Sequence, residues 1–143
     1  MKSQQNLQQN FLQESKVLIS QPAGLAMLHS EGDWKFPAHL QLLNSKLLQV
    51  ASGKIKRLII NMPPQHGKSE FTSKYFPAWY LATHPRNKLI LASYETSFAT
   101  SWGRRAKEVF DEYVPKMYGV KRNPDINVQG NWETEQGGSM YCV

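Results

Sequence analysis

The stretch that decides the expected fold is Asn61–Glu70, which reads NMPPQHGKSE. It follows a short apolar run, KRLIINM (residues 56–62), which lies between a glycine turn and a proline pair and so fits a buried β-strand. After it comes KSEFTSKYFPAWYLATHP (residues 68–85), whose pattern is helical until Pro77, a residue that should end or kink the helix. The stretch is therefore expected to connect a strand to a helix.

The end of this stretch carries the groups that bind a triphosphate with magnesium. Gly67 has no Cβ, so its backbone can approach a phosphate closely. Lys68 would reach the β- and γ-phosphates, and the Ser69 hydroxyl would ligate Mg²⁺. The N–H groups from Gly67 to Glu70 would form the first turn of the helix, whose positive dipole end favours an anion.

The front of the stretch departs from a glycine-rich phosphate loop. Met62 stands where the first glycine is expected, and Pro63 and Pro64 have no N–H to donate. Their fixed φ predicts a stiff, extended entry to the loop. Gln65 and His66 would then complete the phosphate cradle with their N–H groups. The alternative is a Pro-Pro turn with an incidental Gly-Lys-Ser helix start, but the strand before it and the helix after it favour the phosphate site.

The rest of the chain alternates helical and strand-like patterns. Apolar spacing predicts an amphipathic helix within residues 3–20 and a second one over residues 38–50, with Gly53 at its stop. A strand-like run NKLILASY, a helical run SFATSWGRRAKEVFDEYV and a final strand-like SMYCV follow, and the part after Pro115 is turn-rich. This order is typical of βαβ units. It predicts an α/β fold of the P-loop NTPase type, with a mostly parallel sheet flanked by helices.

Composition excludes several classes of protein. The chain has 143 residues, enough for one compact domain, and 17 basic against 11 acidic residues give a net charge of +6, which suits a polyanionic partner. The single Cys142 excludes an internal disulfide, and a reducing, cytosolic setting is the default expectation. The sequence has neither an apolar stretch of about 20 residues nor an apolar segment near its start, so neither a membrane span nor a secretory signal is expected.

Residues 53–110 resemble the N-terminal ATPase region of the large terminase subunits of tailed bacteriophages. The shared features, in order, are a Gly-x-Ile-x-Arg-Leu entry, a Pro-Pro-x-His-Gly-Lys-Ser loop, a Phe-Pro-Ala-Trp helix, an Ile-Leu-Ala-Ser-Tyr strand and a helix with Gly-Arg. The match begins near Trp34, runs to Phe110 and resumes at GGSMYCV, which resembles the strand before the family's Walker B region. Because that run reads like the middle of a strand, the chain is expected to be a fragment, an incomplete fold truncated before Walker B.

The resemblance implies an ATP-driven motor that packages double-stranded DNA into a procapsid. It implies ATP and Mg²⁺ as cofactors, a homo-oligomer in the full-length protein, the portal and the small terminase subunit as partners, and a place in the host-cell cytoplasm, transiently at the procapsid, without a membrane. Residues 1–33 would be a helical lead-in and residues 34–143 a partial P-loop ATPase domain. Lys68 would be the catalytic residue and Ser69 the metal ligand. The nucleotide-binding residues would be Pro64, Gln65, His66, Gly67, Lys68, Ser69, Glu70, Phe36 and His39. Phe36 and His39 lie where the family has a segment on the adenine side of the nucleotide, although His39 is equally well explained as an ordinary polar residue at a helix start.

The sequence departs from the family pattern in two ways. Gln65 stands where many relatives have Arg, so an arginine finger must come from elsewhere; Arg104 and Arg105 are candidates, although a solvated helix face explains them more simply. In addition, no apolar run ends in the acidic pair that would hold magnesium and activate water. The chain alone is therefore expected to bind ATP without hydrolysing it efficiently. Two other readings stay open, a helicase-type P-loop ATPase fragment and a non-enzymatic basic DNA-binding module.

Overall fold

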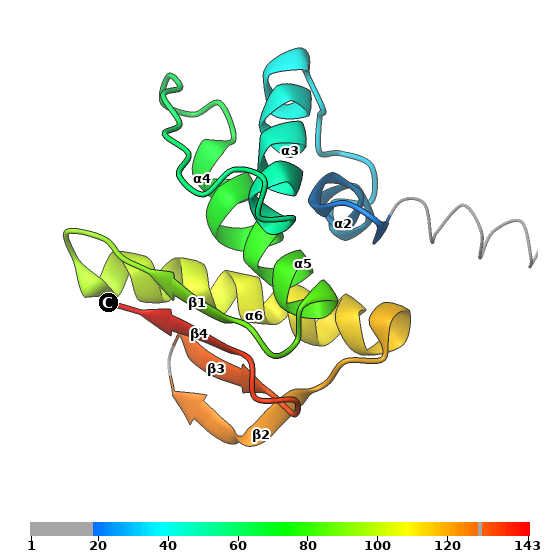
Figure 1. Ribbon diagram of the computed structural model, residues 1–143, viewed down its shortest axis with the longest axis vertical. Helices are drawn as coiled ribbons and strands as arrows, with labels where there is room; N and C mark the ends of the chain where they lie inside the picture. Colours follow the sequence, from blue (N-terminus) through cyan, green and yellow to red (C-terminus); the bar gives the residue numbers. More distant parts are fainter. Residues whose placement is uncertain (1–18, 129) are drawn as a thin grey trace, which may run out of the picture.

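The computed structural model describes residues 19–128 and 130–143 (Figure 1). The helix predicted within residues 3–20 lies outside these residues except for its last two. The helical elements, in chain order, are α2 (Pro22–His29), α3 (Ala38–Ala51), α4 (Lys68–Glu70), the π-helical turn η1 (Phe71–Tyr75), α5 (Phe76–Thr83) and α6 (Thr96–Tyr118). The strands are β1 (Lys88–Leu91), β2 (Arg122–Val128), β3 (Asn131–Thr134) and β4 (Ser139–Cys142).

The four described strands form one mixed sheet in the order β1-β4-β3-β2. Only β1 and β4 pair in parallel, with Lys88 opposite Ser139, whereas β2 with β3 and β3 with β4 pair antiparallel. The α/β prediction is confirmed, and so are the strands predicted from NKLILASY and SMYCV. The prediction of a mostly parallel sheet is wrong, because the region expected to be turn-rich folds into two strands joined by a short turn at Gly130, and antiparallel strands need only such short connections.

The segment Leu58–Met62, predicted as a strand, is extended but belongs to no strand of the described sheet. No main-chain hydrogen bond joins residues 56–66 to another backbone group among the described residues. The segment lies beside α3, where Leu58 and Ile60 are partly buried and Ile59 is 86% exposed. Its apolar character therefore contributes to packing against a helix, while its backbone stays available for pairing.

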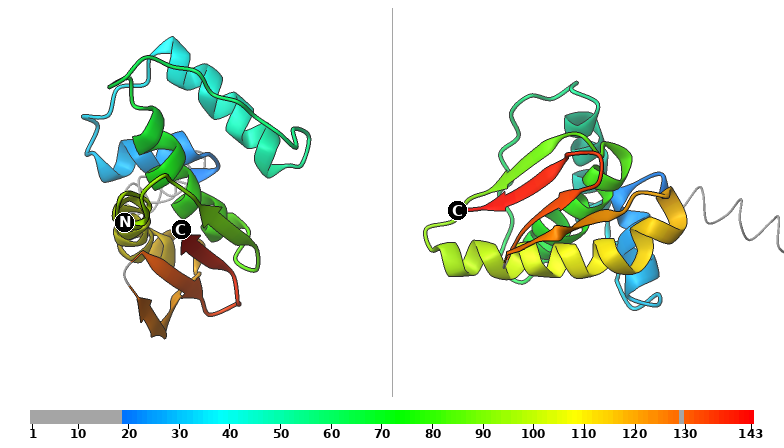
Figure 2. Two further views of the ribbon diagram at one scale, coloured as in Figure 1. Left: turned by 90° about the vertical axis from the view of Figure 1, so that its left-hand side faces the viewer. Right: turned by 90° about the horizontal axis from the view of Figure 1, so that it is seen from below.

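Helix α6 organises the core. It runs along the sheet and also packs against η1 and α5 (Figure 2). Phe110 of α6 and Trp132 of β3 are fully buried, with ring centroids 4.8 Å apart. The indole Nε1 of Trp132 donates a hydrogen bond of 3.2 Å to the carbonyl of Gly103, where the helix leaves no room for a Cβ beside Cys142 of β4. The helix predicted over residues 97–114 is confirmed, and it continues through Pro115 as far as Tyr118.

The helix after the phosphate-like loop accommodates Pro77 without a break. Elements α4, η1 and α5 follow one another from Lys68 to Thr83, and Pro77 lies in the first turn of α5. Proline cannot donate the usual i→i−4 hydrogen bond, and a π-helical turn directly before it is one of the recognised ways in which a helix adjusts its ladder. The interruption that the sequence predicted at Pro77 is thus a local change of helix type.

Candidate nucleotide-binding site

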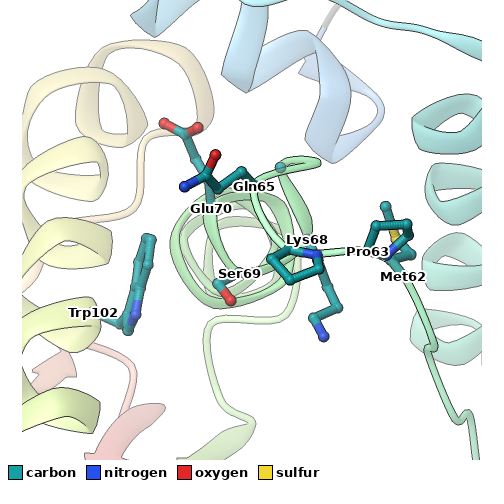
Figure 3. Close-up of a pocket in the computed structure, with 9 residues that line it drawn as sticks. Met62, Pro63, Gln65, Lys68, Ser69, Glu70 and Trp102 are labelled. Atoms are coloured by element: carbon teal, nitrogen blue, oxygen red, sulfur yellow. The ribbon is translucent and has the colours of Figure 1, made fainter.

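The Gly-Lys-Ser stretch lines an open cavity of about 530 Å³ at the start of α4 (Figure 3). This volume lies within the roughly 300–1,000 Å³ typical of small-molecule sites. One lining residue, Trp102, comes from α6, and the others come from the loop and the helix that follows it: Met62, Pro63, Pro64, Gln65, Gly67, Lys68, Ser69 and Glu70. Six of the nine predicted nucleotide-binding residues therefore surround one space.

Two left-handed residues give the loop its shape. Gln65 has φ 61° and Gly67 has φ 79°, and the chain between them turns from the extended entry into α4. Glycine adopts this conformation readily, but for a residue with a Cβ it costs about 1–2 kcal/mol. A Cβ placed on Gly67 would also lie 3.4 Å from Cδ1 of Leu40, which packs beneath the loop. The glycine is therefore required by backbone conformation more than by space.

Pro63 and Pro64 leave the front of the loop with few N–H donors, whereas the N–H groups that follow them have no protein acceptor among the described residues. No side chain caps α4 at Gly67. Among the described residues, no protein acceptor receives a hydrogen bond from the N–H groups of residues 65–70; the first main-chain bond of this helix is from Phe71 N to Gly67 O, at 2.9 Å. These N–H groups sit at the positive end of a continuous helical segment that reaches Thr83. This is a favourable place for an anion.

The side chains at the helix start divide into two groups (Figure 3). The Lys68 ammonium and the Ser69 hydroxyl extend to one side of the helix, whereas the Glu70 carboxylate extends to the other. Glu70 forms an ion pair of 3.3 Å with Lys74 one turn later. No carboxylate of the described residues lies within 4.0 Å of the Lys68 ammonium. A free cation and a hydroxyl thus face the same side, with the only carboxylate lining the described cavity turned away from them.

The two histidines of the region stabilise the loop backbone. The His66 imidazole Nδ1 lies 2.7 Å from the carbonyl of Pro64, and His39 Nε2 lies 3.3 Å from the carbonyl of His66. The two rings meet edge to face with centroids 5.8 Å apart. Neither side chain lines the cavity. Their contacts link the loop to α3, so they position it.

Phe36 also lies outside the cavity. Its ring stacks on Trp34 with centroids 5.4 Å apart, and Trp34 in turn contacts Phe71. The structure thus places both residues expected on the adenine side, Phe36 and His39, next to the site and not in its lining, and the role inferred for them stays a prediction.

Arg104 and Arg105, the candidates for an arginine finger, do not line the cavity either. Arg104 lies 3.9 Å from Glu108 on the exposed helix face, and Arg105 lies over the ring of Trp102.

Three lining residues are absent from the predicted nucleotide-binding set: Met62 and Pro63, which belong to the loop itself, and Trp102. Trp102 is the one that lies far from the loop in the sequence. The sequence pattern assigned it to the packing face of α6, and nothing in that pattern shows that the loop at residues 62–70 approaches this helix turn. It lies 32 to 40 positions from the loop along the chain, so only the tertiary fold brings them together.

The groups at the cavity are of the kinds that a magnesium-bound triphosphate requires. Free N–H groups, the Lys68 ammonium and the Ser69 hydroxyl match a phosphate chain and its metal. No group of three or more His, Cys, Asp or Glu residues among the described residues is arranged to hold a metal ion.

None of the helices in the described part of the chain is both long and apolar enough to span a membrane. Comparisons of the chain with protein-family models, with curated proteins and with solved structures found no match.

Proposed function

We propose that the loop Met62–Glu70 binds ATP with Mg²⁺, and that the chain is the ATP-binding N-terminal part of a motor related to the large terminase subunits. One observation carries the proposal. N–H groups with no protein acceptor and an ammonium with no acidic partner among the described residues lie with a hydroxyl at one cavity, at the start of a helix (Figure 3). These are the three kinds of group that a magnesium-bound triphosphate requires.

Each group has a separate task in this proposal. The N–H groups of Gly67, Lys68 and Ser69 hold the β- and γ-phosphate oxygens, and Lys68 neutralises their charge. The Ser69 hydroxyl would be a ligand of Mg²⁺. A bound Mg²⁺ would supply positive charge that offsets negative charge on the phosphate oxygens. Gln65 can donate hydrogen bonds to a phosphate but supplies no positive charge.

The fold proposal follows from the same loop. A P-loop NTPase carries its phosphate loop between a sheet strand and a helix. In this proposal the extended Leu58–Met62 segment is that strand, and its backbone, which has no main-chain partner among the described residues, is compatible with pairing to further strands. Double-stranded DNA, the portal, the small terminase subunit and self-association in a homo-oligomer belong to the same proposal, and rest on the sequence resemblance alone.

The test is a calorimetric titration of Mg-ATP into the wild-type chain and into Lys68→Ala. The ammonium forms charge-assisted hydrogen bonds, each of which contributes about 1.5–3 kcal/mol, so the variant should bind roughly 10- to 150-fold more weakly. Lys56→Ala, at an exposed lysine outside the cavity, is the matched control and should bind like the wild type. Equal affinity of wild type and Lys68→Ala would refute the proposal.

A further inference from the structure

Trp102 is the one aromatic side chain lining the described cavity, and the binding of phosphates leaves it unused. The cavity extends from the loop at Met62–Glu70 to this indole on α6 (Figure 3). A triphosphate bound at Lys68 and Ser69 therefore has, within the same space, a flat apolar surface on the opposite wall.

Two side chains contact the indole from outside the cavity. The Arg105 guanidinium lies 4.7 Å from the ring centroid, over one face, and Phe98 meets the ring edge to face at 6.3 Å. Neither Arg105 nor Phe98 lines the cavity. In Figure 3 the indole is seen nearly edge-on, with one face turned toward Ser69 and the helix start.

We propose that the face of Trp102 turned toward Ser69 (Figure 3) is the stacking surface for the base of the bound nucleotide, in place of the segment at Phe36 and His39, neither of which lines the cavity. This inference rests on the proposed function, because it assigns the base of the nucleotide whose phosphates bind at Gly67, Lys68 and Ser69. Base–aromatic stacking depends on the π-face of the ring, which every base has, and its strength follows stacking area. The site should consequently prefer purine over pyrimidine nucleotides and discriminate weakly between ATP and GTP.

Stacking and phosphate binding can be separated with two probes. Mg-ATP contains a base, whereas Mg-tripolyphosphate contains only the phosphate chain. Trp102→Ala should weaken Mg-ATP binding about 5- to 150-fold, the range expected for loss of one stacked base, and leave Mg-tripolyphosphate binding unchanged. Trp102→Phe keeps a smaller π-face and should retain most of the affinity for Mg-ATP. The unchanged tripolyphosphate affinity also shows that the variant is folded.

The outcomes distinguish this inference from the proposed function. If the wild type binds both probes and Trp102→Ala binds Mg-ATP as tightly as the wild type, the stacking role is wrong and phosphate binding stands. If Trp102→Ala loses both probes equally while Trp102→Phe restores neither, Trp102 supports the fold and does not stack on a base. If the wild type binds neither probe, the proposed function fails and the stacking role fails with it.

Discussion

Replacement of Gly103 by alanine tests the close approach of α6 to Cys142 of β4 and to the turn at Gly130. A Cβ at this position would lie 2.4 Å from Sγ of Cys142, 2.6 Å from the carbonyl oxygen of Gly130 and 3.1 Å from the Gly130 Cα. Two of these atoms belong to the backbone. Gly130 cannot retreat freely, because its own α-carbon already lies against Thr100 of the same helix, where an added Cβ would meet main-chain atoms at 2.8–3.0 Å.

The expected magnitude follows from two opposing effects. Overpacking costs typically 1–3 kcal/mol, and a clash with backbone belongs at the upper end, about 3 kcal/mol. Alanine is favoured over glycine inside a helix by about 1 kcal/mol. The net loss in the free energy of unfolding should therefore be about 2 kcal/mol, which corresponds to a decrease in Tm of roughly 6–10 °C for a domain of this size.

The assay is urea and thermal unfolding followed by circular dichroism. Ser101→Ala, two residues away on the same helix, is the control; its hydroxyl only donates back to the carbonyl of Phe98, so stability should stay the same or rise slightly. A Gly103→Ala variant as stable as the wild type would show that α6 does not approach Gly130 and Cys142 in this way, and the core packing described above would be wrong.

Two further predictions concern a buried thiol and a partly buried imidazole. Burial raises the pKa of the Cys142 thiol, whose sulfur lies 3.2 Å from the Gly130 carbonyl. Ellman's reagent at pH 8 should therefore label Cys142 at least about 100-fold more slowly in the native protein than in urea. Rapid labelling of the native protein would contradict the burial of this thiol. Burial, and secondarily the charge of Lys74, lowers the pKa of His29 below its ordinary value of 6.5, so the folded state binds fewer protons than the unfolded state between the lowered value and 6.5. The free energy of unfolding should therefore fall as the pH drops below about 6.5. In His29→Gln, unfolding curves measured from pH 5 to 7.5 should show a weaker dependence of this free energy on pH. An unchanged dependence would assign it to other groups.

Elements with strong local patterns were predictable from the sequence. The leucines between residues 40 and 48 repeat at helical spacing, and α3 forms there; the apolar runs that became β1 and β4 carry their own strand signal. Helix α2 was missed because Pro22 and Gly24 read as breaks, although proline at the first helical position is a preferred start. The β2–β3 hairpin was missed because Asn123, Pro124 and Asp125 are typical of turns.

Local sequence patterns do not show which strands pair or which distant residues meet at one site. An apolar run such as Leu58–Met62 indicates extended backbone, but the partner of a strand depends on what the rest of the chain places beside it. The same holds for Trp102, whose position opposite the loop follows from the packing of α6 against η1 and α5. The Gly-Lys-Ser groups, in contrast, lie on adjacent residues, so their meeting at one cavity could be predicted without knowledge of the fold.

The measurement that tests the nucleotide site most directly is the titration of Mg-ATP into the ¹⁵N-labelled chain, with every assigned amide followed by NMR. Phosphate binding at the loop should produce the largest shifts at the amides of Gln65–Glu70, whose N–H groups have no protein acceptor in the described structure. The indole N–H of Trp102 should shift as well, since it borders the same cavity. If the chemical shifts of these amides do not change while ATP saturates the protein, or if the largest changes occur at other residues, the loop is not the nucleotide site.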